Sequence, residues 1–527
     1  MTNKYLYFTL LAVLGLNVES YAQQTSGNQP PRLVVSITID QLRTDYLEAF
    51  APLYSDNGFR RLLDEGLVYT RASYPFSPID RASAIATLST GVTPYYNNIV
   101  GMRWLDRQTL RPTWCVDDKK YSGVGTTDCT SPIHLTTSTV GDELKVETDG
   151  KSLVYAIAPN RDAAILSAGH AANGAVWIDD SNGLWCTTQF YTTGQPAWVQ
   201  VANNGENAPA NKIDDLTWEP VNELVGNFSY FMRTGLQKPF KHKFSGLRRF
   251  EEFKASAMVN TAITDMAAQC VAGTNMGNDR ITDMLCLTYY AGNYDHRTLT
   301  ECLIEIQDTY VRLDQELSRL FRYLEERVGK ANILYVVTST GYSDQENADY
   351  QKYRIPTGTF YMSRTSNLLN MYLGAIWGQG KYVEAHFKNQ IFLNHQLLEQ
   401  KKISIAEASN RSQEFLAMLS GVRNVYTSLQ LLTASDEYTR KIRNGFNPER
   451  CGDLLIEAAP GWRLLDEDTQ EQELVRASFI QFPIIFYGAG TTKEKVTIPV
   501  TTDRIAPTIA RAIRIRAPNA CSSEPLF

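Results

Sequence analysis

Short apolar runs, each followed by a helical pattern, constrain the fold of this chain more than any other feature. Residues 32–40 form a β-branched run that ends in Asp40, and residues 284–290, 332–338 and 482–487 are similar runs. Runs that are apolar on both faces are typical of parallel strands covered by helices on each side. The alternation predicts an α/β fold with a doubly wound, mainly parallel sheet sandwiched by helices. Asp40 is then expected at the carboxyl edge of the sheet, where such folds place their sites.

Other segments extend this pattern or interrupt it. Residues 46–66 and 300–328 have helical apolar spacing, and residues 67–70 form a second short strand pattern. The Trp-, Asn- and Gly-rich part at about 176–243 breaks the rhythm, and so does the mixed part at about 346–462. We expect both parts to be insertions into the sheet domain, the first of them a cap segment.

The first 22 residues predict export. They contain one Lys, an apolar run over residues 5–16 and the small-x-small sequence Ser20, Tyr21, Ala22, with cleavage expected after Ala22. The apolar run is too short to cross a bilayer, and no later run supplies the ~20 apolar residues of a membrane helix. We therefore expect a periplasmic or extracellular protein without a transmembrane segment.

Charge and cysteine content narrow the partner classes. The net charge of −6 is mild and unclustered, which argues against nucleic acid or an anionic membrane as a partner. Eight cysteines follow the export signal, so disulfides are possible, and Cys115 and Cys129 flank a polar loop and could pair. No C-x-x-C sequence occurs, so a thiolate metal site is not expected.

Several motifs in fixed order indicate a family. Residues 74–104 include Pro75, Pro78, Thr90, Gly91, Pro94, Ile99 and Gly101, and further matching segments lie at residues 35–47, 162–179, 306–313, 450–462 and 483–488. On these residues the chain resembles the secreted bacterial alkaline phosphatases of the type I phosphodiesterase/nucleotide pyrophosphatase branch of the alkaline phosphatase superfamily. The resemblance covers nearly all of residues 23–527, and it implies a phosphatase fold with a Thr nucleophile and two zinc ions.

The resemblance also implies that the catalytic residues are replaced. The nucleophile position falls on Arg81, and a guanidinium cannot attack phosphorus. Of the implied zinc-ligand positions only Asp40 keeps a typical ligand, and a one-residue slip would let His296 serve as another. These positions are Asp40, Asn293, Arg297, Thr340, Gly341 and Gln481. Three or four protein donors per zinc are needed, so an ordinary two-zinc centre is not expected.

The substrate-binding positions differ in the same way. The family's Asn falls on Met102, and its Lys-x-Arg pair falls on Asn160 and Asp162, where a carboxylate would repel phosphate. Arg161 lies between them and could partly replace the lost charge. These residues and Arg81 form the expected anion pocket.

Plainer interpretations stand beside these. Asp40 could ligate a metal or be a solvated or capping carboxylate, and Arg81 could bind an anion or pair with Asp80. The Asp295–His296 step could form a weak metal site or an ordinary surface loop. Ser77 and Ser83 flank the nucleophile position without a His–carboxylate partner for a serine triad. His170 is expected to be structural.

Three functions remain open from the sequence. The first is a catalytically inactive, exported alkaline phosphatase-like protein that binds an anionic small ligand or an unidentified protein partner, with no cofactor. The second is an active metal-dependent phosphomonoesterase or phosphodiesterase that holds zinc through rearranged ligands. The third is a structural component of an envelope assembly.

Overall fold

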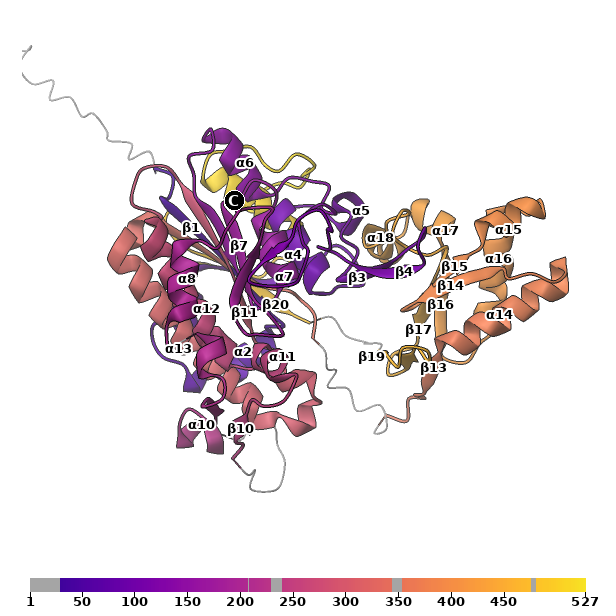
Figure 1. Cartoon of the computed structure of the whole chain (residues 1–527), viewed down its shortest axis with the longest axis horizontal. Helices are drawn as coiled ribbons and strands as arrows, with labels where there is room; N and C mark the ends of the chain where they lie inside the picture. Colours follow the sequence, from indigo (N-terminus) through magenta and orange to yellow (C-terminus); the bar gives the residue numbers. More distant parts are fainter. Residues whose placement is uncertain (1–28, 207, 229–238, 344–352, 475–479) are drawn as a thin grey trace, which may run out of the picture.

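The computed structural model describes residues 29–527 except 207, 229–238, 344–352 and 475–479. The expected export signal at residues 1–22 lies outside the described residues. Figure 1 shows a large unit built on one broad sheet and a second, smaller unit beside it. Within the described ranges, no helix combines the length and apolar character needed to cross a bilayer.

The broad sheet confirms the predicted fold class. Its strand order is β21-β2-β20-β12-β1-β11-β6-β7-β8-β5, with β22 paired to β2. The central strand β1 (Leu33–Asp40) pairs in parallel with β11 (Asp283–Tyr290) on one side and β12 (Ile333–Ser339) on the other. All three strands are almost entirely buried, as expected for parallel strands covered on both faces.

The remaining strands of this sheet flank that centre. Strand β6 continues the parallel pairing from β11 and β7 continues it from β6, whereas β20 is antiparallel to β12 and to β2. Their bounds are β2 (Leu67–Ser73), β5 (Gly123–Val124), β6 (Val154–Ile157), β7 (Gly174–Ile178), β8 (Trp185–Thr188), β20 (Phe482–Gly488), β21 (Glu494–Val496) and β22 (Val500–Thr501).

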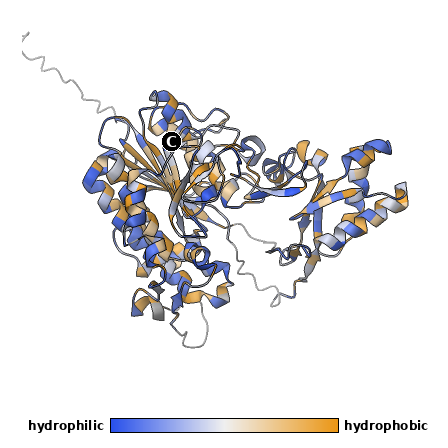
Figure 2. Cartoon of the chain, viewed as in Figure 1, coloured by the Kyte–Doolittle hydropathy of each residue, from blue (hydrophilic) through white to orange (hydrophobic). Residues whose placement is uncertain are grey.

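Helices cover both faces of the sheet, because side chains alternate between the faces along each strand. Leu33, Val35, Ile37 and Ile39 of β1 pack in a core with α12 (Met258–Thr274) and α13 (Leu303–Val328). Val34 points the other way, into a core with α4 (Arg81–Thr90), α6 (Val140–Glu147), α7 (Arg161–Ala168) and α19 (Ile505–Ala512). Figure 2 shows apolar residues concentrated along the strands between these layers.

The continuous helix predicted over residues 46–66 was wrong. The structure has α2 (Thr44–Ala49), a 3-10 turn η1 (Ala51–Leu53) and α3 (Phe59–Glu65) instead. Asp314 of α13 accepts hydrogen bonds from the backbone N–H groups of Ser55 (2.8 Å) and Phe59 (2.7 Å), which holds the chain in a bend between the two helices. The helix predicted at 300–328 is present as α13, preceded by the turn η3 (Leu299–Glu301).

The segment at about 176–243 begins inside the broad sheet, because β7 and β8 are strands of that sheet. Its later part packs in the core that contains α12 and α13, where α8 (Ala197–Asn204) contacts α12 and a two-stranded sheet pairs β9 (Thr217–Trp218) with β10 (His242–Lys243). The short helices here are α9 (Pro209–Lys212), α10 (Glu223–Asn227) and α11 (Arg249–Lys254).

The range at about 346–462 contains most of the second unit, which has its own apolar core. Its antiparallel sheet has the order β14-β15-β17-β16, and a smaller sheet has the order β13-β18-β19. The strands are β13 (Thr359–Tyr361), β14 (Val383–Phe387), β15 (Gln390–Leu393), β16 (Val422–Thr427), β17 (Leu454–Ala458), β18 (Arg463–Leu465) and β19 (Gln472–Leu474). The helices are α14 (Met362–Trp377), α15 (His395–Gln400), α16 (Ile405–Leu416), α17 (Ser428–Leu432) and α18 (Glu437–Asn444).

A hairpin from the large unit holds the second unit in place. It consists of β3 (Arg103–Asp106) and β4 (Arg111–Trp114), which follow α5 (Pro94–Asn97). Arg107 forms an ion pair with Asp453 at 3.1 Å, and its guanidinium lies over the ring of Phe392 at 5.0 Å. Leu105 packs against Phe392 in a small apolar cluster.

The possible disulfide between Cys115 and Cys129 is absent, and all eight cysteines are free thiols. Cys115 is fully buried in the core that contains α4 and α7, whereas Cys129 lies on a partly exposed loop. Burial raises the pKa of the Cys115 thiol well above its usual range, which disfavours the reactive thiolate.

His170 is structural, as expected, and it makes stability depend on pH. Its Nδ1 lies 3.1 Å from the Asp142 carboxylate. The hydrogen bond to Asp142 raises the pKa of His170, although burial acts to lower it. Burial acts to raise the pKa of Asp142, but the hydrogen bonds it accepts, first among them that from His170, lower it. The His170 contribution is therefore fully present below the unfolded pKa of about 6.5 and is lost as pH rises through the raised folded pKa.

We expect His170→Ala to lower the free energy of unfolding by about 1 kcal/mol at pH 5 and by less above pH 8, because only protonated His170 gains the full interaction. Urea unfolding at both pH values measures this. In an Asp142→Asn background the pH dependence of the His170→Ala effect should disappear. An equal effect of His170→Ala at both pH values would contradict the assignment.

Candidate functional site at the sheet edge

Four polar side chains from four elements meet at the carboxyl edge of the broad sheet. Asp40 ends β1, Thr340 follows β12, Arg81 is the first residue of α4 and Asp162 lies in the first turn of α7. Strands that run parallel end at one edge, and the helices of the adjacent layer begin there. The topology therefore brings residues 40, 81, 162 and 340 together, as the sequence positions predict.

The guanidinium of Arg81 is the centre of this group. It donates to Asp162 twice, from Nε to Oδ2 at 2.8 Å and from Nη2 to Oδ1 at 3.0 Å. Its Nη1 lies 3.6 Å from Oδ2 of Asp40, and Nη2 lies 3.6 Å from the sulfur of Met102. The Arg81 and Asp162 side chains are only 14% and 8% exposed. Arg81 is thus held by two carboxylates that come from β1 and α7.

The interpretation of Arg81 as the partner of Asp80 was wrong. Asp80 is the N-cap of α4, and its Oδ1 accepts a hydrogen bond from the backbone N–H of Ser83 at 3.0 Å. Its Oδ2 accepts from the backbone N–H of Met102 at 2.6 Å. The Ser83 hydroxyl completes the capping box, so that it has a structural role. Because Asp80 is occupied at the helix start, Arg81 turns toward Asp162.

Burial and charge act in opposite directions on this pair. Burial by itself would lower the pKa of Arg81, but the charges of Asp162 and Asp40 outweigh it and raise that pKa. Burial would likewise raise the pKa of Asp162, and Arg81 reverses the shift and lowers it. Both groups are therefore charged at neutral pH and depend on each other for that charge.

Asp40 is neither solvated nor a helix cap. It is 2% exposed, and its Oδ1 accepts a hydrogen bond from Thr340 Oγ1 at 2.8 Å. Its Oδ2 faces the hydroxyl of Tyr342 at 3.4 Å and the guanidinium of Arg81. Each carboxylate oxygen is thus directed at a hydroxyl or at the cation. Tyr342 joins the site through the turn after β12, and no sequence pattern in the chain marked it.

The other implied ligand positions do not fit a two-zinc centre. The amide nitrogen of Asn293 donates to the backbone carbonyl of Arg297 at 3.0 Å. The Arg297 side chain is a cation that lies over the ring of Tyr294 at 4.8 Å. Gln481 is exposed and accepts a hydrogen bond from Thr44 N–H through its backbone carbonyl. Zinc requires His, Cys or carboxylate donors, and these positions offer none.

Gly341 leaves no room for a ligand side chain. Its φ angle is +69°, and a Cβ atom there would lie 2.6 Å from the ring of Tyr74. Tyr74 is itself fixed, because its hydroxyl donates to the carbonyl of Ser339 at 2.8 Å. A His at position 341 would therefore have to displace a buried Tyr ring and adopt a strained backbone conformation.

The Asp295–His296 step lies in a surface turn. Asp295 forms ion pairs with Arg248 at 3.1 Å and with Arg297 at 3.7 Å, and His296 is exposed next to the ring of Tyr290. Neither residue belongs to a group of three or more metal-ligating side chains in the described part of the chain.

Arg161 does not replace the lost positive charge in the anion pocket. Its guanidinium pairs with Asp117 at 3.1 Å and with Asp128 at 3.2 Å, and it lies over the ring of Trp114. Asn160 is the N-cap residue of α7 and makes no side-chain capping bond. No sequence pattern indicated Asp117 and Asp128, because they come from a loop whose path depends on tertiary packing.

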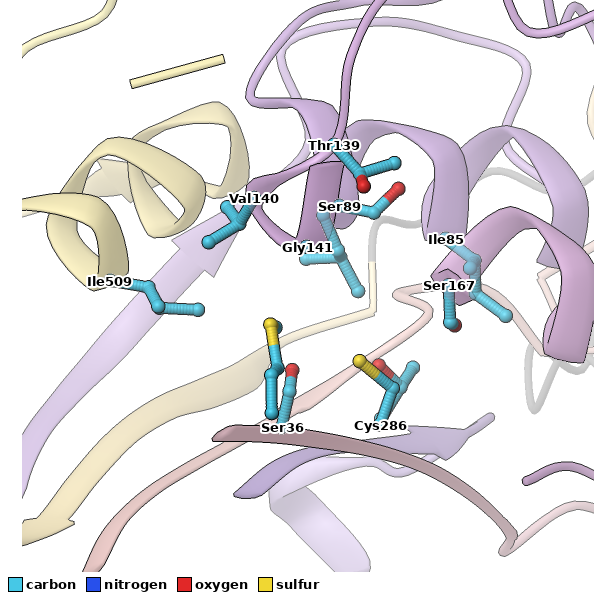
Figure 3. A pocket seen from close by; sticks show the side chains of 12 residues that line it. Ser36, Ile85, Ser89, Thr139, Val140, Gly141, Ser167, Cys286 and Ile509 are labelled. Carbon is cyan, nitrogen blue, oxygen red and sulfur yellow. The ribbon is translucent and has the colours of Figure 1, made fainter. Parts of the chain in front are cut away.

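A small cavity lies between β1 and the helices α4 and α6, and it is not part of the site. It has a volume of about 20 Å³ and is lined by residues of β1, α4 and α6 (Figure 3), among them Ser36, Ser89 and Thr139. None of the four residues at the sheet edge lines it. This volume holds about one water molecule, so the cavity does not accommodate a substrate.

Comparisons with known proteins show which proteins this chain is similar to. The family model for type I phosphodiesterase/nucleotide pyrophosphatase matches residues 34–479. Alkaline phosphatase PafA of Elizabethkingia meningoseptica is 28% identical over 98% of this chain and 98% of its own length. Alkaline phosphatase PhoV of Synechococcus elongatus is 28% identical, over 93% of this chain and 91% of its own. The crystal structure of wild-type PafA superposes with a TM-score of 0.81 at 26% identity, covering 94% of this chain and 98% of that one.

We expect Arg81→Ala to lower the free energy of unfolding by about 3–5 kcal/mol, because it leaves Asp162 charged, buried and unpaired. The double variant Arg81→Ala/Asp162→Ala should lose less than the sum of the two single variants, which a urea-unfolding cycle measures. The control is Arg60→Ala, since Arg60 pairs with Asp56 at the surface and its loss should cost less than about 1 kcal/mol. Equal losses for Arg81→Ala and Arg60→Ala would contradict this prediction.

Proposed function

Since the chain belongs to the type I phosphodiesterase/nucleotide pyrophosphatase family, we propose that it is a catalytically inactive, exported relative of the alkaline phosphatases that acts by binding. The ion pair between Arg81 and Asp162 carries this proposal. Arg81 lies at the position where the family resemblance puts the nucleophile, and Asp162 lies at one position of the phosphate clamp.

The charges at the sheet edge support the proposal that this chain does not hydrolyse phosphate esters. Arg81 has no lone pair to attack phosphorus, and its donors already face Asp162 and Asp40. Two carboxylates and one guanidinium leave the group with a net negative charge. A phosphate would have to displace the Asp162 carboxylate and then lie next to two anions, which opposes its binding.

The same charges favour a protein partner over a small anion. Arg81 is held by Asp162 and Asp40, and Arg161 is held by Asp117 and Asp128. An anionic ligand would compete with two carboxylates at either guanidinium. A protein surface can instead bind the fold without entering the sheet edge, and a shared fold does not by itself imply a shared function.

The alternative is an active phosphatase, and one observation favours it. The chain is 28% identical to alkaline phosphatase PafA over 98% of its length. Such an enzyme would need zinc donors from positions other than Asn293, Arg297, Gly341 and Gln481, and a nucleophile other than Arg81. The inactive protein requires no such rearrangement.

Turnover of p-nitrophenyl phosphate with added zinc tests the proposal. We expect no hydrolysis above the protein-free background, with PafA assayed in parallel as the active control, because the nucleophile position carries a guanidinium. Zinc content of the purified protein should be the same in wild type and Asp40→Asn. Zinc-dependent turnover that Asp40→Asn abolishes would overturn the inactive assignment and restore the enzyme.

Calorimetry with inorganic phosphate separates the two kinds of binding partner. We expect no phosphate binding with a Kd below about 1 mM, since the guanidinium groups of Arg81 and Arg161 are already paired with carboxylates. Phosphate binding that is lost in Arg81→Ala and retained in Arg60→Ala would instead identify the sheet edge as an anion pocket.

A further inference from the structure

We propose that His386, Asp466 and Asp468 of the second unit form a binding site for one divalent transition-metal ion. In the described residues they are the one group of three or more His, Cys, Asp or Glu side chains whose ligand atoms all lie within 4.8 Å of one another. They belong to the second unit, away from Asp40, Arg81 and Asp162. The proposal is therefore independent of whether the large unit is catalytic.

Three elements of the second unit bring these side chains together. His386 lies on β14, and Asp466 and Asp468 lie in the turn between β18 and β19. Ser363, in the first turn of α14, adds a hydroxyl that lies 3.0 Å from Asp468 Oδ2 and 3.4 Å from His386 Nε2. The site thus depends on tertiary packing, since its donors are separated by about 80 residues of sequence.

The carboxylate oxygens in the turn between β18 and β19 have different partners. Oδ1 of Asp466 accepts the backbone N–H of Asp468 at 2.9 Å, which leaves Oδ2 facing His386. Glu467 is used elsewhere, because its carboxylate accepts the backbone N–H of Ser363 at the start of α14 at 2.8 Å. The turn therefore commits one oxygen of Asp466 to its own fold, while Asp466 Oδ2 faces the imidazole of His386 and Asp468 Oδ2 faces the hydroxyl of Ser363.

The separations suit metal ligands better than hydrogen bonds. His386 Nε2 lies 3.5 Å from Asp466 Oδ2 and 3.4 Å from Ser363 Oγ, both longer than a good hydrogen bond. Zinc bonds of about 2.0–2.2 Å in a tetrahedron place neighbouring ligand atoms roughly 3.3–3.6 Å apart. Asp468 is exposed, so its carboxylate can rotate toward an ion without disturbing the core.

The arrangement is not a serine triad. In a triad the serine and the carboxylate contact different nitrogens of the imidazole, so that the carboxylate orients the ring. Here Ser363 and Asp466 both face Nε2 of His386. An imidazole nitrogen that faces two oxygen atoms can share one bound cation with them.

Local charge also favours a cation. Asp466, Glu467 and Asp468 are consecutive carboxylates, and in the described part of the chain none of them forms an ion pair with Lys or Arg, whereas nearby Glu471 pairs with Arg103 at 2.6 Å. A divalent ion with two carboxylates and one imidazole is neutral overall, and an imidazole donor selects a transition metal over calcium or magnesium.

Calorimetric titration of zinc ion into the chelator-treated protein tests the site. We expect wild type to bind one zinc ion at the site. We expect His386→Ala and Asp468→Asn to weaken this binding by at least about 100-fold, since even the loss of a residue that only orients a metal ligand costs about 10–100-fold. Asp468 is exposed, so Asp468→Asn should fold normally, which the circular dichroism spectrum checks. Zinc should also raise the Tm of wild type and not that of Asp468→Asn.

His296→Ala is the matched control, because His296 is an exposed imidazole outside the cluster, and it should leave zinc binding unchanged. No zinc binding by wild type, or binding that persists in both His386→Ala and Asp468→Asn, would overturn the site. Binding that is lost only in Asp40→Asn would overturn this inference and also count against the proposed loss of the zinc centre. If neither His386→Ala nor Asp40→Asn changes zinc binding, the metal-site inference fails and the proposed function is unaffected.

Discussion

The ion pair of Arg81 with Asp162 and Asp40 ties the start of α4 to the start of α7 and to the end of β1. Each charge is buried, so each is stable only while the others remain in place. The capping box of Asp80 and Ser83 fixes the helix end from which Arg81 extends, and Thr340 fixes Asp40 from the neighbouring strand. The polar edge of the sheet is thus one connected network.

The core and the polar edge of the sheet depend on different residues. The β-branched strands and the apolar faces of α12 and α13 form the core, and Asp40, Arg81, Asp162 and Thr340 are not part of it. Arg81 alone would be a buried, unpaired charge, and Asp162 supplies the matching carboxylate. In the function we propose, this pair occupies positions that the family resemblance assigns to the nucleophile and to the phosphate clamp.

The second unit has a core of its own, and the hairpin of β3 and β4 contacts it through Arg107 and Leu105. The metal site that we propose lies in this unit, where His386, Asp466 and Asp468 come close together. If the protein acts by binding, this unit offers a surface that remains available while the sheet edge is closed by its own ion pairs.

The sequence by itself determined the central buried strands, the mainly parallel sheet and the family, because periodicity and motif order are local properties of the chain. It did not determine the break between α2 and α3, which depends on Asp314 from a distant helix. It also offered the sequence neighbour Asp80 as an ion-pair partner of Arg81. Only the tertiary structure decided that Arg81 pairs with Asp162, since a long side chain chooses among carboxylates by distance in space and by burial rather than by distance along the chain.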